Sequence, residues 1–225
     1  PRLCDAGRAC GRGGREGAGV STGAIYIGGA RLIDGSGEPP PGGPQALLIE
    51  GERIAAVAPE AELPPPPGAR VIDAGGMTVM PGLIDCHDHL ANLGGGMVAR
   101  AAIPPSLAVF LAAESFRQTL EAGITSVRDA SGVDLGMKMA VERGLIPGPR
   151  LKISVNIICQ FGGHNDHTEP AGVDSTYPKL QTIPDGVCDG VDACRHKVRE
   201  MVRAGADWIK IATTGGVGTP TGGPL

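Results

Sequence analysis

The feature that most constrains this chain is the stretch TVMPGLIDCHDHL at residues 78–90, where an apolar run leads straight into two histidines. Side chains on a β-strand alternate between its faces, so residues two apart point the same way. We therefore predict a buried strand from Val79 to Asp85 that leads into His87 and His89, with both imidazoles able to reach one metal ion. Two histidines at this spacing also arise by chance, as surface or core groups. The apolar strand before them and the glycine-rich loop after them favour a metal site.

Length and composition limit the classes of protein that remain. The chain has 225 residues, of which 41% are hydrophobic, so it can bury a sizeable core, yet it is shorter than a complete eight-stranded barrel of roughly 250 residues. A net charge of −4 and only six aromatic residues of the Phe, Tyr and Trp types predict no nucleic-acid partner. We find neither an apolar run of about 18 residues nor the apolar core of a signal peptide, so we expect no membrane association.

Cysteine usage bears on the compartment. The six cysteines include no CxxC pair and do not form the framework of a small secreted domain. This pattern is typical of reduced thiols, so we expect a cytoplasmic enzyme with a small-molecule substrate.

The amino-terminal third divides into two parts. Residues 1–24 are rich in Gly, Arg and Ala, with few large apolar residues, so we predict a disordered tail. Residues 25–80 alternate short apolar runs with turns and predict a small β unit. Within it, the pair Gly51-Glu52 between Leu47–Ile49 and Ile54–Val57 predicts a hairpin.

Residues 81–225 alternate strand and helix patterns. Strands are predicted at 124–128, 151–158 and 207–212, and helices at 106–121, 135–143 and 192–204. Four alternations predict parallel βα units. We expect the first helix to bury Leu107, Phe110, Leu111 and Leu120, and the last helix to be capped by Asp192 and to expose His196. The long segment 159–190 is a candidate functional loop.

Five stretches of the chain resemble the amidohydrolase superfamily: VIDAGGMTVMPGLIDCHDHL, GITSVRDASG, GPRLKIS, FGGHNDH and GADWIKIATTGGV. From about residue 25 onward the chain is similar to its imidazolonepropionase-like and Xaa-Pro dipeptidase-like branch. The resemblance implies an α/β fold in which residues 81–225 form the amino-terminal half of a (β/α)8 TIM-type metal-dependent hydrolase barrel. Residues 25–80 would belong to a small β-sandwich. Two further strand-end histidines and a catalytic aspartate of the family would lie beyond Leu225, so we expect a partial gene product.

A lysine within the last predicted strand is the second chemical feature. Burying an amine is costly unless it is paired, and desolvation lowers its pKa. The residues leave two alternatives open for Lys210: a neutral amine that combines with carbon dioxide as a carbamate, or an ammonium that pairs with a carboxylate such as Asp129. The resemblance favours the carbamate. It implies two zinc ions that Lys210 bridges, with His87 and His89 as further ligands.

The motif FGGHNDH supplies a candidate substrate contact. His164 resembles the family's third-strand histidine that faces the substrate, which implies a substrate-binding role. Asn165 stands where the family pattern has Gly, which puts the backbone shape of the loop in question. We interpret Asp166 as a brace of the loop and His167 as a surface histidine.

Three further features have structural interpretations. Asp85 either orients a histidine or fills the barrel interior. Arg128 and Asp129 are interpreted as an ion pair at a strand end. The stretch TTGGVGTP at 213–220 lacks the phosphate-binding pattern GxxxxGK[ST] and is interpreted as a lid or binding loop.

Together these features predict a metal-dependent hydrolase that cleaves an amide C–N bond, in dipeptides or N-acyl amino acids, with a metal-activated water. One alternative is an imidazolonepropionase-type cyclic amide hydrolase, which the resemblance describes as a one-metal enzyme without need of Lys210. Another is a catalytically incomplete fragment that acts only as a binding or structural piece. The sequence leaves a homo-oligomer open.

Overall fold

The computed structural model describes residues 23–38, 41–94, 97–176 and 179–216. The chain divides into two compact units, Pro1–Pro81 and Gly82–Leu225. Nearly all of the tail predicted at residues 1–24, and part of the loop predicted at 213–220, lie outside the described residues. Within the described ranges, no helix is both long and apolar enough to cross a membrane.

The first unit is built around a five-stranded sheet with the order β3-β2-β1-β4, in which β5 also pairs with β1. A short 3-10 helix, Glu60–Glu62, follows the third strand. The strands are β1 (Ile25–Leu32), β2 (Gln45–Glu50), β3 (Arg53–Pro59), β4 (Arg70–Asp73) and β5 (Thr78–Val79). The predicted hairpin is confirmed, because Glu50 pairs with Arg53 across the turn at Gly51-Glu52.

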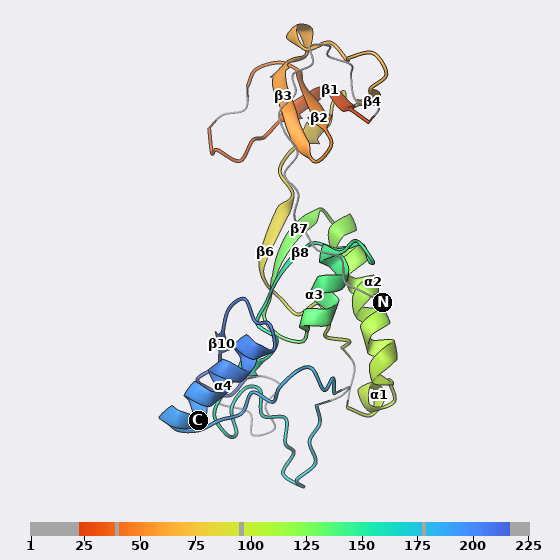
Figure 1. The fold of residues 1–225 in the computed structure, drawn as a ribbon. Helices are drawn as coiled ribbons and strands as arrows, with labels where there is room; N and C mark the ends of the chain where they lie inside the picture. The colour runs from red at the N-terminus through yellow and green to blue at the C-terminus, as the bar shows by residue number, and fades with distance from the viewer. Residues whose placement is uncertain (1–22, 39–40, 95–96, 177–178, 217–225) are drawn as a thin grey trace, which may run out of the picture. The chain divides into compact units, whose positions relative to one another are not determined.

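The second unit has a three-stranded parallel sheet, β6-β7-β8, and a two-stranded parallel sheet, β9-β10. Figure 1 shows helices α2 and α3 beside the larger sheet, where α2 packs against β7 and α3 against β8. The strands are β6 (Leu83–Asp88), β7 (Ile124–Asp129), β8 (Arg150–Ile153), β9 (Ile157–Ile158) and β10 (Lys210–Ile211). The helices are α1 (Met97–Ala101), α2 (Pro105–Glu121), α3 (Leu135–Glu142) and α4 (Val191–Arg203). The α/β class is therefore confirmed.

Two predicted strands are each divided in the structure. The strand predicted from Val79 to Asp85 is interrupted at Pro81-Gly82, so β5 pairs within the first unit and β6 begins the second. The strand predicted at 151–158 breaks at Val155, whose φ of 67° is incompatible with an extended strand. The first half, β8, pairs with β7, and the second half, β9, pairs with β10.

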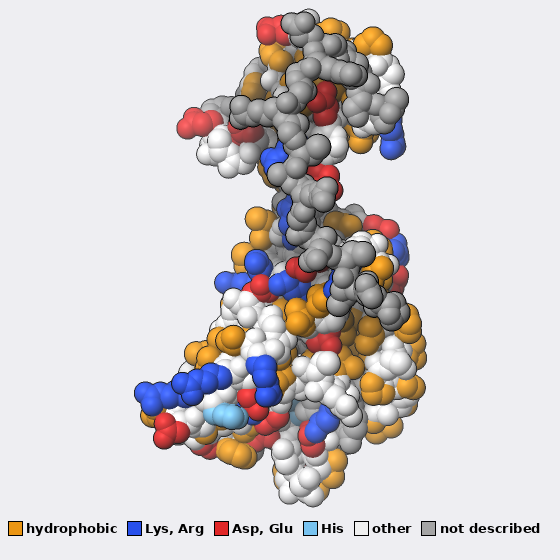
Figure 2. Space-filling model, in the orientation of Figure 1, with side chains coloured by type: hydrophobic (Ala, Val, Ile, Leu, Met, Phe, Trp, Pro, Cys, Tyr) orange, Lys and Arg blue, Asp and Glu red, His pale blue; other side chains and the backbone are white. Residues whose placement is uncertain are grey.

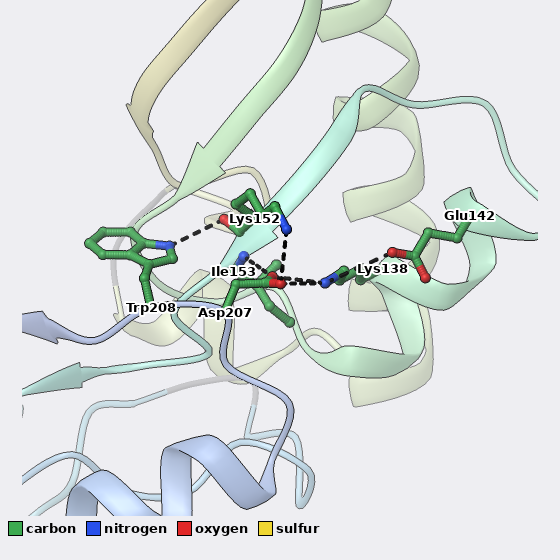
Figure 3. A network of polar contacts seen from close by, with 6 residues as sticks. All are labelled: Lys138, Glu142, Lys152, Ile153, Asp207 and Trp208. Carbon is green, nitrogen blue, oxygen red and sulfur yellow. Dashed lines mark hydrogen bonds and ion pairs between the residues drawn. The ribbon is translucent and has the colours of Figure 1, made fainter.

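A polar network fixes the segment before β10 against β8 and α3 (Figure 3). Asp207 accepts hydrogen bonds from the backbone N–H of Ile153, at 2.9 Å, and from Lys138 Nζ, which lies 2.8 Å from both carboxylate oxygens. The backbone N–H of Asp207 donates to the carbonyl of Ile153 at 2.8 Å. The predicted strand 207–212 thus shortens to two residues, because its first residues bond to β8 while Lys210 pairs with Ile157 of β9.

The helices occur close to their predicted bounds, but the buried face of α2 differs from the prediction. Its buried residues are Ala108, Ala112 and Phe116, which are spaced four apart. Apolar side chains expected in the core lie exposed along α2 instead (Figure 2), among them Leu107, Phe110 and Leu111. This face, with two small residues and one large one, is the face that packs against the sheet.

The start of α4 also differs from the prediction. Gly190 precedes the helix, no side chain caps it, and Asp192 lies inside the first turn. The expected exposure of His196 is confirmed, since its side chain is 74% exposed.

Candidate metal centre

The two histidines of the HxH motif lie together at the end of β6. The ring centroids of His87 and His89 are 5.4 Å apart, and the rings are inclined at 61°. A β-bulge lies between Asp85 and Asp88, because three steps of β6 match two steps of β7. Bulges re-aim side chains where a ladder ends. The strand end therefore presents both imidazoles on one side, one exposed and one half-buried.

His89 has a defined electrostatic environment. Its Nδ1 lies 3.4 Å from the carbonyl oxygen of Ser131, in the turn after β7. Partial burial lowers the pKa of His89, the Ser131 carbonyl opposes this, and the positive charges of His87 and Lys210 lower it further. A neutral imidazole is the form that binds a metal ion, so this environment suits a ligand.

Lys210 is the first residue of β10 and is half-buried. Its positive charge is among the influences that lower the pKa of His89, after burial of the ring and the charge of His87. Within the described parts of the chain Lys210 forms no ion pair, with Asp129 or any other carboxylate. The ion pair with Asp129 that one interpretation required is therefore not formed within the described residues.

Asp129, the last residue of β7, is fully buried and does not pair with Arg128 as the sequence suggested. Arg128 Nε donates to the carbonyl of Cys86 at 2.7 Å, and its guanidinium lies 4.7 Å from the ring centroid of Trp208. Burial raises the pKa of Asp129 to about 7, against the opposing effect of three backbone N–H donors. Arg128 and Asp129 do not pair because successive residues of a strand point to opposite faces of the sheet.

His164 lies in the loop after β9 and is tied to the segment after β10. Its backbone N–H donates to the carbonyl of Thr214 at 3.1 Å. The His164 ring packs against Gly216, where an added Cβ would lie 1.8 Å from Nδ1. Gln160 Nε2 also reaches the carbonyl of Thr213, at 3.2 Å. These contacts connect the loop to the segment just after β10, the strand that contains Lys210.

The neighbours of His164 stabilise the loop. Asp166 accepts from the backbone N–H groups of Gly162, at 2.9 Å, and Thr168, at 3.1 Å, which confirms its expected role as a brace. Asn165 Nδ2 donates to Asn156 Oδ1 and to the carbonyl of Ile157, both at 3.0 Å, so an asparagine here adds contacts that glycine could not make. His167 is half-buried rather than at the surface, and this burial lowers its pKa.

Asp85 does not orient an imidazole in this structure. Its Oδ1 accepts the backbone N–H of His87 at 2.8 Å, so it stabilises the bulge. Asp88 acts in the same way on the backbone N–H of His89, at 2.7 Å. Sequence reasoning missed Ser131 and the backbone contacts of Asp129, although the Asp-Ala-Ser-Gly run at 129–132 is a recognisable turn signal.

The donor set fits a metal ion in part. Across the described residues, no three His, Cys, Asp or Glu side chains gather closely enough to hold a metal. The two imidazoles of His87 and His89 are therefore the candidate donors at this place. Catalytic zinc sites use nitrogen and oxygen donors and keep one position open.

Comparison with known proteins identifies a family match over most of the chain. The model described as Amidohydrolase family matches residues 78–224. Among curated relatives, an ochratoxinase of Aspergillus niger is 32% identical over 206 residues, which cover 86% of this chain and 42% of that protein. An imidazolonepropionase of Pseudomonas aeruginosa is 31% identical over 193 residues, covering 67% of this chain and 46% of that protein.

Solved structures agree with this match. A prolidase complexed with N-methylphosphonate-L-proline has a TM-score of 0.75 and 32% identity, covering 90% of this chain and 50% of that chain. A Xaa-Pro dipeptidase with methionine bound in its active site has a TM-score of 0.73 and 27% identity, covering 86% of this chain and 48% of that chain. The chain thus spans about half the length of these relatives, and the branch suggested by its motifs is confirmed.

Proposed function

The chain belongs to the amidohydrolase family, and from that premise we propose that it contributes the metal-binding half of a hydrolase that cleaves amide C–N bonds in dipeptides or N-acyl amino acids. The observation that carries the proposal is the position of His87 and His89, whose ring centroids lie 5.4 Å apart at the end of β6. Members of the family are generally metal-dependent, which fits two imidazoles placed together at a strand end.

The proposed fold of the second unit is the first half of a (β/α)8 barrel, with the first unit as part of a β-sandwich. Three parallel strands with α2 and α3 packed on β7 and β8 support the barrel, and β9-β10 would continue it. In such barrels the reacting groups gather at the carboxyl ends of the strands. His87 and His89 lie at the end of β6, and His164 follows β9.

Each residue has a proposed task. His87 and His89 would hold the metal through ring nitrogens, and Lys210, as a carbamate formed with carbon dioxide, would supply oxygen donors to a two-zinc centre. His164 holds the carbonyl or the carboxylate of the substrate. A bound divalent metal would lower the pKa of a water molecule toward about 7 and polarise the scissile carbonyl. The carbamate would form by attack of the unprotonated Lys210 amine on the carbon of carbon dioxide, with loss of one proton from the nitrogen.

The substrate class is proposed from the relatives. The prolidase and the Xaa-Pro dipeptidase are named for a peptide bond to proline, and the prolidase binds a phosphonate derivative of proline. An ochratoxinase is also similar to this chain, so the proposed substrates are not restricted to dipeptides. A cyclic amide hydrolase of the imidazolonepropionase type is the second candidate, because such an enzyme is also similar to this chain.

The test combines metal content with hydrolysis of Xaa-Pro dipeptides, N-acyl amino acids and imidazolonepropionate. We expect zinc to co-purify with the protein, and its content to fall at least tenfold in His87→Ala and His89→Ala. The exposed His196→Ala on α4 is the matched control and keeps its zinc. Loss of zinc in the control as well would refute the proposed ligands.

Lys210→Ala separates the two candidates. The carbamate proposal predicts that the variant keeps at most one zinc and loses dipeptide hydrolysis. An unchanged two-metal enzyme would rule out the bridging role, and unchanged hydrolysis of imidazolonepropionate with one metal would support the second candidate. A protein that binds zinc and hydrolyses none of these compounds would instead favour a binding or structural piece.

A further inference from the structure

Asp129 is a buried carboxylate whose hydrogen bonds all go to the backbone of the two turns beside the histidine pair. Its Oδ2 accepts the N–H of Leu90 at 2.9 Å, directly after His89. Its Oδ1 accepts the N–H of Ser131 at 3.2 Å and of Val133 at 3.3 Å. One side chain thus joins the turn that leaves β6 to the turn that leaves β7.

The turn after β7 is fixed further by its own backbone. Gly132 has a φ of 107°, which only glycine adopts readily, and its N–H donates to the carbonyl of Val155 at 3.0 Å. The N–H of Ala130 donates to the carbonyl of Asp88 at 2.7 Å. With Asp129 inside the turn, the carbonyl of Ser131 has a defined direction, and it faces His89.

The contact between the Ser131 carbonyl and His89 indicates which ring nitrogen carries the proton. A carbonyl oxygen can only accept a hydrogen bond, so the 3.4 Å contact is a hydrogen bond only when the proton resides on Nδ1. A neutral ring with its proton on Nδ1 leaves Nε2 with a free lone pair. Groups that fix the tautomer of a ligating histidine in this way tune the affinity of a site for its metal.

We propose that Asp129 is a positioning residue of the metal centre, which holds the turn 129–133 so that the Ser131 carbonyl keeps His89 in the tautomer that presents Nε2 to the metal. The inference rests on the proposed function, and it concerns Asp129, for which the sequence predicted only an ion pair with Arg128 or with Lys210. This positioning role differs from a purely structural one, because it predicts which ring nitrogen of His89 carries the proton in the metal-free protein.

The first experiment determines the tautomer of His89 in the metal-free protein from the 15N shifts of the imidazoles near pH 8, with His89→Gln to identify the signal. We expect the proton on Nδ1 in the wild type and, in Asp129→Asn, a mixture of tautomers or a shift to Nε2. The asparagine keeps one acceptor oxygen and places an NH2 group against the remaining N–H donors, so it cannot hold both turns. A wild-type proton on Nε2 would overturn the proposal.

The second experiment measures Zn²⁺ affinity by competition with a chromophoric chelator. The matched control is Asp134→Asn, since Asp134 is also buried and accepts a backbone N–H, from Met137 at 2.8 Å, and a hydroxyl, from Thr182 at 2.6 Å. We expect a loss of roughly 10–100-fold for Asp129→Asn and less than about threefold for Asp134→Asn. If Asp129→Asn and Asp134→Asn lower the melting temperature equally and do not differ in Zn²⁺ affinity, Asp129 is purely structural and the proposal is refuted.

Two outcomes keep this inference separate from the proposed function. A wild-type protein that binds no Zn²⁺ refutes the proposed function, while the tautomer in the metal-free protein still decides the inference on Asp129. Asp129→Glu, which keeps both carboxylate oxygens one methylene further out, replaces the asparagine variant if that variant does not fold. The glutamate variant refutes the inference if it has both the wild-type tautomer and the wild-type affinity despite a loosened turn, seen as faster amide exchange at Ser131 and Val133.

Discussion

Asp207→Asn tests how the segment before β10 is held in place (Figure 3). The substitution keeps an oxygen that can accept the N–H of Ile153, but it removes the charge that faces Lys138 Nζ at 2.8 Å. The side chains of Lys138 and Asp207 are 13% and 18% exposed, so water replaces the lost contact poorly. Fully exposed pairs contribute about 0.2–1 kcal/mol, and removing one partner of a buried pair costs about 3–5 kcal/mol. The intermediate exposure gives an expected loss of about 2 kcal/mol.

The assay is urea unfolding followed by far-UV circular dichroism. Lys152→Ala is the matched control, because Lys152 Nζ lies 3.4 Å from the same carboxylate but its side chain is 71% exposed, and we expect a loss below about 0.5 kcal/mol. A double-mutant cycle with Lys138→Met isolates the pair from other effects of each substitution. A coupling energy near zero, or equal losses for Asp207→Asn and Lys152→Ala, would refute the reasoning.

The same carboxylate predicts a pH dependence. Partial burial opposes its ionisation, but the hydrogen bonds from Lys138 and Ile153 outweigh this and lower the pKa of Asp207. A group whose folded-state pKa lies below its unfolded value stabilises the fold above the unfolded pKa and loses that contribution on acidification. The free energy of unfolding of the wild type should therefore fall more steeply below about pH 4 than that of Asp207→Asn. Parallel acid profiles would contradict the assignment.

Three further predictions concern packing and reactivity. Phe116→Ala should lower the free energy of unfolding by about 3–5 kcal/mol in urea, because the ring is fully buried, and a loss below about 1 kcal/mol would contradict this packing. Gly186→Ala should cost about 1–3 kcal/mol in the same assay, since the new Cβ would lie 1.8 Å from the carbonyl oxygen of Ile157, whereas Gly42→Ala, with no atom within 4 Å, is its neutral control. Alkylation mapped by mass spectrometry should modify the exposed Cys86 at least ~10-fold faster than the buried Cys188. Burial, followed by the contact with Cys194, raises the pKa of Cys188 to about 11, so little of it is present as the reactive thiolate. Equal rates would refute this prediction.

Much of the second unit could be predicted because its elements carry local signals. The bounds of α2 and α3 lie close to those predicted, and Gly123, just after α2, adopts the φ of 86° that is typical of a glycine at a helix end. The two-residue spacing of His87 and His89 predicted that they would lie together, and they do, although a bulge between Asp85 and Asp88 interrupts the regular alternation. These features depend on residues that are neighbours in sequence, so the pattern alone contains them.

The features that escaped prediction depend on distant partners. The bulge in β6 is defined by its register with β7, and the buried face of α2 is defined by the side of the helix that packs against the sheet. The contact of Asp129 with Leu90 joins residues 39 apart. Backbone N–H groups are present at nearly every position, so sequence carries no pattern that says which of them a carboxylate will bind.

The unusual backbone conformation of Val155, between β8 and β9, has a consequence for the candidate site. This β-branched residue is fully buried at a φ of 67°, a conformation that costs such residues of order 1–3 kcal/mol and that its surroundings must impose. The residues before Val155 form β8, which pairs with β7. The residues after it form β9, which pairs with β10, the strand that contains Lys210. Val155 thus connects the strand that pairs with β7 to the strand that pairs with β10, so its backbone conformation helps to set how far the proposed ligand Lys210 lies from the proposed ligands His87 and His89.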